Sequence, residues 1–293
     1  VVRHVPVLET PPRSAFRFRD GELTLAKTTA PLDISWSRPL PKGVEPTSAT
    51  VSLDAAGRWH VSLLCEDRSI KPLPKIKTAV GIDLGISALA TLSTGEKIHN
   101  PRHSDSEQAR KRLFAKALSR KQKGSKNRFK ARMKLARMHA RIVDRRRDAL
   151  QKLSTRLIRE NQVIVVESLN VSGMVRNHCL ARVISDASWS ALLNMLAYKA
   201  AWYGRRLVQV DRFFPSSKTC HCCGFVVEAL PLSIREWACP VCGVVHDRDH
   251  NAALNLLAAG HAVSREGKAC GPGVSRRILR NQVQLGLKQE PGA

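Results

Sequence analysis

The sequence predicts an α/β domain built around a mixed β-sheet, preceded by a small strand-rich segment and interrupted by a metal-binding insertion. Three observations predict this architecture. Apolar strand patterns alternate with amphipathic helical patterns along residues 78–260, as they do when helices cover a sheet. Residues 1–75 instead contain short runs that alternate apolar and polar residues. Two Cys-x-x-Cys pairs separate the last predicted strand from the last predicted helix.

The charge of the chain indicates a polyanionic partner. Its 293 residues include 49 Lys and Arg against 24 Asp and Glu, a formal net charge of +25. Nucleic acid is the usual partner of so basic a protein, and an anionic membrane surface is the alternative. No apolar run is long enough to span a bilayer and no signal-peptide pattern opens the chain, so we expect a cytoplasmic protein. The first residue is Val1 rather than Met, which indicates a fragment or a start further upstream.

The strand-rich segment, residues 1–75, is expected to form part of a small antiparallel barrel or sheet. Its runs FRFRDGELTLAK and SATVSLDAAGRWHVSLLCED alternate apolar and polar residues. The second run is broken by DAAG at 54–57, which is a hairpin signal. The basic, proline-containing stretch KPLPKIK at 71–77 predicts a linker into the α/β domain.

The α/β domain is expected to consist of strands and helices that succeed one another after this linker. In chain order they are three strands over 78–100, a buried strand over 162–169, an amphipathic helix over 188–207, a strand over 207–215, a helix over 250–260 and a flexible tail over 261–293.

A long basic stretch, residues 102–160, predicts a helical hairpin broken near KGSKN at 123–127. Between Arg102 and Arg147 there are eighteen Lys or Arg and only three acidic residues. With so few opposing acids, we interpret this stretch as a clamp on nucleic-acid phosphates rather than an ordinary solvated face. Apolar residues at helical spacing predict one packed face, made of Leu113, Ala117, Leu135, Met138 and Ile142.

Three acidic residues stand where a core disfavours charge. Asp83 interrupts the apolar run AVGIDLGI, Glu167 ends VIVVE, and Asp249 directly precedes HNAALNLL. Each could be a satisfied structural acid, such as a helix cap or an ion-pair partner. Together, in so basic a chain, they favour a shared site at one end of the sheet. Converged carboxylates bind Mg²⁺, and two such ions can activate a water and stabilise a leaving oxygen in phosphodiester hydrolysis.

The cysteine spacing predicts a structural zinc site. Cys220 and Cys223 are separated by fifteen residues from Cys239 and Cys242, and Gly follows the second Cys of each pair. Four thiolates bind Zn²⁺ tetrahedrally and leave no open position. Cys222 is a competitor of Cys223, and a pair of disulfides is the alternative to a metal.

The chain resembles the TnpB/OrfB proteins of bacterial insertion sequences, which are similar to type V CRISPR effector nucleases. Four blocks carry the resemblance, which covers about residues 33 to 260: GIDLGI, VIVVESLNVSGMVRN, LARVISDASWSALLNMLAYKAAWYGRRLVQVDRFFPSSKTC and CPVCGVVHDRDHNAALN. The resemblance implies a RuvC-like nuclease of RNase H fold, split by a zinc ribbon. It also implies a guide RNA from the transposon end and cleavage of double-stranded DNA beside a short motif.

The resemblance also implies roles for individual residues. Asp83 matches the first RuvC acid and Glu167 the second. The third lies in HDRDHNAALN, where we favour Asp249 over Asp247 because Asp249 directly precedes the helix. Ser168 stands where many relatives carry Asp.

By the same resemblance, the chain is expected to divide into five parts. They are a partial wedge-like β-barrel over 1–75, the nuclease domain over 76–215 with the basic hairpin inside it, the zinc ribbon over 216–248, the last nuclease helix over 249–260 and the tail. The expected nucleic-acid-binding residues are Lys111, Arg112, Lys121, Lys123, Lys126, Arg128, Lys130 and Lys218.

Two alternatives to a guided nuclease stay open. Relatives normally carry a longer N-terminal region with a helical recognition lobe, so we expect this chain to be N-terminally truncated. A catalytically compromised remnant that only binds RNA and DNA is therefore one alternative. A transposase that joins DNA ends is the other, because a 3′-hydroxyl can replace water in the same acid-dependent chemistry.

Overall fold

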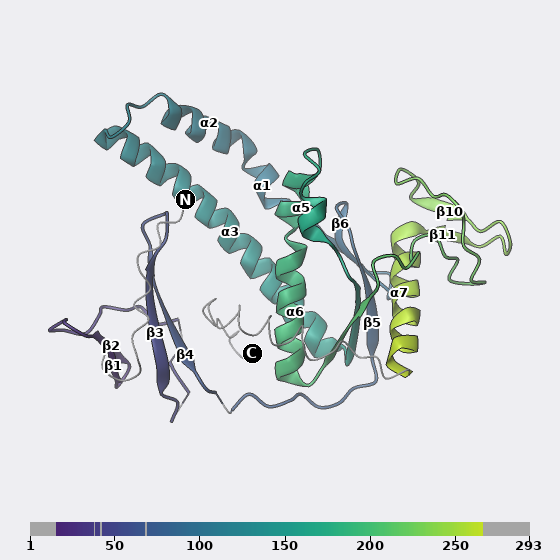
Figure 1. The fold of residues 1–293 in the computed structure, drawn as a ribbon, viewed down its shortest axis with the longest axis horizontal. Helices are drawn as coiled ribbons and strands as arrows, with labels where there is room; N and C mark the ends of the chain where they lie inside the picture. The colour runs from purple at the N-terminus through teal and green to yellow at the C-terminus, as the bar shows by residue number, and fades with distance from the viewer. Residues whose placement is uncertain (1–15, 38, 42, 68, 266–293) are drawn as a thin grey trace. The chain divides into compact units, whose positions relative to one another are not determined.

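The computed structural model describes residues 16–37, 39–41, 43–67 and 69–265 (Figure 1). They fall into two compact units, each described here by itself. Among the described residues, one unit contains those from 16 to 71 together with Glu107–Asp144, and the other contains Pro72–Ser106 together with those from 145 to 265. Over the described ranges, no helix combines the length and the apolar composition that crossing a membrane would require.

The larger unit is built on a mixed β-sheet, as the sequence predicts. The five strands of this sheet have the order β7-β6-β5-β8-β9. Strands β5, β6 and β7 are antiparallel neighbours, whereas β8 and β9 continue the sheet parallel to β5. The strands are β5 (Ala79–Leu84), β6 (Ala88–Leu92), β7 (Lys97–His99), β8 (Val163–Glu167) and β9 (Arg206–Val210). The last strand is shorter than the predicted 207–215, because the chain turns at Asp211.

Apolar side chains bury both faces of this sheet. On one face Val80, Ile82, Ile164 and Val166 join a core that includes the C-terminal part of α3 (Lys126–Glu160). The same core includes side chains from α5 (Ala181–Ala187) and α6 (Trp189–Tyr203). On the other face Val165 packs with β9 and with α7 (Arg248–Arg265), and Figure 1 shows α6 and α7 on opposite sides of the sheet. The near-continuous apolar run of β8 is what a strand covered on both faces requires.

Helix α7 lies directly against β5 because the strand presents a glycine there. A Cβ at Gly81 would stand 2.1 Å from the carbonyl oxygen of Ala253, so only glycine leaves room for the helix backbone. At its other end, Gly260 of α7 faces Val165 of β8 in the same way. The helix begins before and ends after the predicted 250–260, which places Asp249 inside its first turn.

Helix α6 is also shorter than predicted. It ends at Tyr203 rather than at residue 207, because Gly204 adopts a left-handed φ of 64° and caps it. The chain then enters β9 at Arg206. A short helix α4 (Val171–Met174) precedes α5 in the same unit.

The smaller unit begins with two β-hairpins. Strands β1 (Phe16–Arg19) and β2 (Glu22–Leu25) pair antiparallel, as do β3 (Pro46–Leu53) and β4 (Trp59–Cys65). The predicted turn at 54–57 is confirmed, and Asp54 accepts backbone hydrogen bonds inside it. The first run is not one strand, because Asp20 and Gly21 both take positive φ and turn the chain. These strands form two separate two-stranded sheets, so the barrel stays a prediction.

The basic hairpin is formed by α2 (Gln108–Ser119) and α3, after a short helix α1 (His103–Ser106). The chain turns between Ser119 and Lys126, where Gly124 has a φ of 84°. The apolar face is confirmed for Met138 and Ile142, each 5% exposed, and Leu135 is partly buried. It is wrong for Leu113, which is 64% exposed, and for Ala117, which is also exposed.

Candidate active site

Two of the three predicted acids lie side by side at one edge of the sheet. Asp83 is the fifth residue of β5 and Glu167 is the last residue of β8. The two strands are parallel neighbours, with Ile82 opposite Val166. Asp83 and Glu167, the next residues, therefore lie together at the carboxyl ends of these strands.

Helix α7 brings the third acid to this edge. Asp83 follows Gly81 by two residues and therefore lies on the same face of β5. Asp249 precedes Ala253 by four residues and therefore lies on the same face of α7. Because Ala253 rests on Gly81, Asp249 is carried toward Asp83.

The electrostatics of the site show that the three carboxylates interact. Burial first, and then the charges of Asp249 and Glu167, raise the pKa of Asp83 to about 7, against the opposing effect of Arg248 and Arg235. Burial also raises the pKa of Glu167 above its ordinary value. A carboxyl group whose pKa is raised by burial is costly to ionise until a cation compensates its charge.

The carboxylate oxygens are not drawn together as closely as metal ligands. Among the described residues, the only group of three or more His, Cys, Asp or Glu whose ligand atoms all lie within 4.8 Å is a cysteine cluster. Asp249 instead has the guanidinium of Arg235 at 3.5 Å. Mutual repulsion between the ionised acids opposes a closer approach. Because their oxygens are not within the distances of a shared ion, the metal site stays a prediction.

Asp247, the second choice for the third acid, has a structural role. Its Oδ1 accepts a hydrogen bond of 2.9 Å from the backbone N–H of His250, so it caps α7. Its Oδ2 accepts one of 2.6 Å from Lys97 of β7. Burial opposes its ionisation, but these two donors hold the pKa of Asp247 below its usual range. The cap role considered for Asp249 therefore belongs to Asp247.

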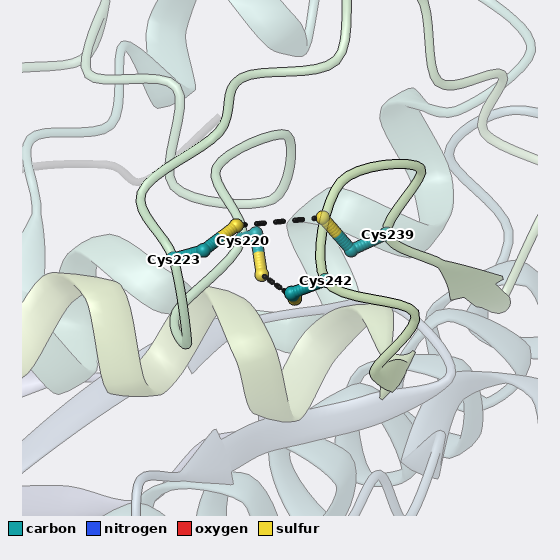
Figure 2. A group of neighbouring side chains, drawn as sticks. All are labelled: Cys220, Cys223, Cys239 and Cys242. Atoms are coloured by element: carbon teal, nitrogen blue, oxygen red, sulfur yellow. Dashed lines mark hydrogen bonds between the residues drawn. The ribbon is translucent and has the colours of Figure 1, made fainter.

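The four predicted cysteines form one cluster at the tips of two loops, as Figure 2 shows. The Sγ atoms of Cys220 and Cys242 are 3.6 Å apart, and those of Cys223 and Cys239 are 3.5 Å apart. Tetrahedral Zn²⁺ with Zn–S bonds of about 2.3 Å needs sulfurs about 3.8 Å apart, so the cluster fits this ion. Cys222 is exposed and is not a member.

The two loops repeat one backbone pattern. The N–H of Gly224 donates to the carbonyl of Cys220, and the N–H of Gly243 donates to that of Cys239, each over 2.9 Å. Both glycines have positive φ, 77° and 71°, as the predicted tight turns require.

The acidity of the thiols depends on their crowding. Burial opposes ionisation of Cys239, but backbone amides and neighbouring thiols lower its pKa to about 6. A backbone hydrogen bond favours the thiolate of Cys223, but burial and the neighbouring thiols raise its pKa to about 12. Repulsion between negative charges at this spacing keeps some of the four thiols protonated. A bound metal cation would stabilise all four as thiolates.

The cysteine segment leads directly into the helix that carries Asp249. Its strands β10 (Glu236–Ala238) and β11 (Val245–Asp247) pair antiparallel, and β11 leads directly into α7. Near the cluster, His246 lies 3.0 Å from the Sγ of Cys220. The backbone N–H of Arg248 donates to the carbonyl of Arg235 over 2.8 Å, which closes the hairpin beside Asp249.

Two asparagines of α7, which the sequence analysis did not single out, hold the start of this segment. Asn251 and Asn255 are 1% and 5% exposed. Both donate to the carbonyl of Thr219, over 2.7 and 2.6 Å, and Asn255 also donates to that of Ser216 over 2.8 Å. Their spacing of four residues inside the apolar run HNAALNLL is the signal that could have identified them.

The predicted nucleic-acid-binding residues fall in both units. Two of them already make internal contacts: Arg128 donates to the carbonyls of Leu118 and Lys121, and Lys218 donates to that of Glu228. Lys111 and Arg112 lie on α2. The exposed members are Arg112, Lys121, Lys123, Lys126 and Lys130.

Two family models match the chain. Residues 62–178 match the OrfB_IS605 family, described as "Probable transposase". Residues 189–256 match the Cas12f1-like TNB domain. Together they span the sheet, the basic hairpin and the cysteine cluster.

Curated relatives resemble most of the chain. A "Putative RNA-guided DNA endonuclease" of Streptomyces pristinaespiralis is 60% identical over 282 residues, which are 95% of this chain and 68% of that protein. "Putative RNA-guided DNA endonuclease InsQ" of Escherichia coli (strain K12) is 34% identical over 83% of this chain and 61% of that protein. The chain thus spans roughly two thirds of the length of these relatives.

Among solved structures, one chain of a "Cryo-EM structure of the Cas12f1-sgRNA-target DNA complex" has a TM-score of 0.44 and 16% identity, over 71% of this chain and 55% of that one. The likeness to the S. pristinaespiralis relative, by contrast, is high in identity and covers more than two thirds of it. With the match to the OrfB_IS605 family, it shows that this chain belongs to the TnpB/OrfB family of insertion-sequence proteins.

Proposed function

We propose that the protein is a transposon-associated, RNA-guided DNA endonuclease that hydrolyses phosphodiesters with divalent metal ions. One observation carries the proposal. Helix α7 packs on Gly81 and carries Asp249 toward Asp83 and Glu167, and burial together with the charges of Asp249 and Glu167 raises the pKa of Asp83. The names of the curated relatives agree with this activity.

Asp83, Glu167 and Asp249 are the residues that would hold Mg²⁺. Carboxylate oxygens are the hard ligands that this ion prefers, and a partly buried acid of raised pKa is stabilised by a cation. When bound, Mg²⁺ supplies Lewis acidity at the phosphate and a more acidic water. Asp83 must first lose its proton, and Arg235 and Arg248 favour that loss. In this proposal the sheet edge serves as the RuvC-like, RNase H-like site that the family resemblance implies.

The cysteine cluster has a supporting role in this proposal. Cys220, Cys223, Cys239 and Cys242 would bind Zn²⁺ with no open position, so the ion contributes structure rather than chemistry. Closing the cluster fixes the segment that runs through β11 into α7. The zinc ribbon thereby sets the approach of Asp249 to the other two acids.

Guide RNA and double-stranded DNA are the proposed partners. The net charge of +25 supports a polyanionic ligand. The exposed lysines of the basic hairpin, Lys121, Lys123, Lys126 and Lys130, would contact phosphates of either nucleic acid.

The decisive experiment is DNA cleavage by the protein co-purified with its RNA. We expect Mg²⁺-dependent cleavage that is lost in Asp83→Ala. The matched control is Asp148→Ala, which removes an exposed carboxylate of α3 paired with Lys152 and should cleave normally. RNA binding without cleavage would instead indicate a non-catalytic remnant, and joined DNA ends would indicate a transposase.

A further inference from the structure

An exposed aromatic ring lies three residues after the strand that ends opposite Glu167. Phe213 is 77% exposed, among the highest values for a large apolar side chain in the described residues. Its neighbours Asp211 and Arg212 are exposed and polar, and Phe214 is partly buried, so the exposed apolar surface of this turn is limited to the Phe213 ring and Pro215. A surface of that size suits one nucleobase better than a protein partner, which would need a wider patch.

The ring belongs to a turn that starts at the catalytic sheet edge. Strand β9 ends at Val210, whose register partner on β8 is Glu167. The N–H of Ser168 donates to the carbonyl of Val210 over 2.9 Å, so this edge stays paired to its end. Phe213 follows Val210 by three residues, which keeps its backbone within about 10 Å of Val210.

The turn is held rigidly on both sides of the ring. The carboxylate of Asp211 accepts the N–H of Phe213 over 2.8 Å, and the carbonyl of Asp211 accepts that of Phe214 over 3.1 Å. Phe214 packs into the core under α7, and Ser216 is bonded to Asn255 of that helix. Phe213 is thus exposed on a fixed support rather than on a free loop.

A cation already lies on the ring. The guanidinium carbon of Arg212 is 4.5 Å from the centroid of the Phe213 ring, a cation–π arrangement. The remaining exposed ring surface is open to a base, and Arg212 offers charge for the phosphate that follows. Aromatic side chains of this kind bind unstacked bases with little sequence preference.

We propose that Phe213 and Arg212 form a stacking platform for one unpaired nucleotide of the DNA strand that enters the active site. This proposal rests on the proposed nuclease function and adds the form of the substrate. A strand held by its stacked base presents its backbone to Asp83 and Glu167. The platform therefore selects single-stranded DNA at the site of hydrolysis, because the bases of a duplex are not free to stack on a side chain.

Photocrosslinking tests the platform without requiring cleavage. The probe is a single-stranded oligodeoxynucleotide with 5-iodouracil, irradiated with the full chain carrying Asp83→Ala, and crosslinked peptides are mapped by mass spectrometry. We expect a crosslink at Phe213 besides those on the basic hairpin. The crosslink in the peptide containing residue 213 should fall about tenfold in Phe213→Ala and persist in Phe213→Tyr, which keeps a ring.

A matched control and a separate assay keep the outcomes distinct. Leu232 is also 77% exposed but is not aromatic, so Leu232→Ala should leave the Phe213 crosslink unchanged. Crosslinks confined to the basic hairpin, or an unchanged yield in the peptide containing residue 213 after Phe213→Ala, would overturn the platform. The Mg²⁺-dependent cleavage assay of the wild type decides independently whether the chain is a nuclease.

Discussion

At the residue scale, two aspartates that the sequence leaves as rivals have different surroundings, and we propose different roles for them. Asp247 caps α7 and pairs with Lys97, whereas Asp249 has the guanidinium of Arg235 at 3.5 Å and would serve as the third metal ligand. We expect Asp249→Asn to reduce Mg²⁺-dependent cleavage by more than about 100-fold, since loss of an outer-shell partner alone costs about 10–100-fold.

The Asp247→Asn variant distinguishes an effect on stability from an effect on cleavage. Asp247→Asn should lower the free energy of unfolding by up to about 1 kcal/mol, because the ion pair with Lys97 and the negative charge at the start of α7 are lost, while most cleavage remains. Cleavage rates and thermal melts of both variants are the measurements. The opposite pattern, with Asp247→Asn inactive and Asp249→Asn active, would exchange the two roles.

The raised pKa of Asp83 predicts a pH-dependent stability. Its pKa is about 7 when folded against 3.8 for an ordinary Asp, so the folded chain binds this proton more tightly than the unfolded chain does. The resulting stabilisation is fully present below pH 3.8 and is lost as pH rises through about 7. At pH 8 the ionised carboxyl therefore costs up to about 4 kcal/mol.

Asp83→Asn removes this cost, and thermal melts without added divalent cations can measure the change. The variant should melt above the wild type at pH 8, and the difference should narrow toward pH 5. Adding Mg²⁺ should stabilise the wild type but not the variant, because the ion needs the carboxylate. A difference that stays constant across this pH range would mean that Asp83 does not titrate near neutrality.

At the element scale, the cysteine segment determines whether α7 starts in the right place. Cys239→Ser should lose zinc and lower cleavage, because the cluster holds in place the segment that continues into β11 and the first turn of α7. Cys222→Ser is the matched control, since Cys222 lies outside the cluster and should keep zinc and activity. Metal content by mass spectrometry and cleavage are measured together. Normal cleavage by a zinc-free Cys239→Ser protein would remove the positional role of the cluster.

Local patterns in the sequence predict several of these elements because their causes are local. The mixed sheet follows from apolar runs of strand length, and the cysteine cluster follows from spacing and two glycines. The hairpin at Asp20 and Gly21 was missed although an Asp-Gly pair is a turn signal, because the whole run alternates.

Other features depend on partners far along the chain. Asp247 forms an ion pair with Lys97, 150 residues earlier, and the raised pKa of Asp83 depends on burial and on the charge of Asp249. Asn251 and Asn255 are recognisable only once the carbonyls of Ser216 and Thr219 are known to lie beside α7. Local sequence patterns do not reveal these long-range contacts. The sequence therefore indicates which acids are candidates but not which role each one has.

At the scale of the whole molecule, the dominant property is a net charge of +25, and it predicts how binding depends on salt. Each phosphate contact with duplex DNA contributes about 0.9 to the slope of log binding constant against log salt. Replacing Lys121, Lys123, Lys126 and Lys130 by Ala should therefore reduce that slope, by up to about 3.6 if every one of them contacts a phosphate. The same four positions changed to Arg keep the charge and should keep the slope. Filter-binding titrations across salt concentrations measure it. An equal slope for the Ala and Arg proteins would mean that the phosphate contacts are made by residues other than these four lysines.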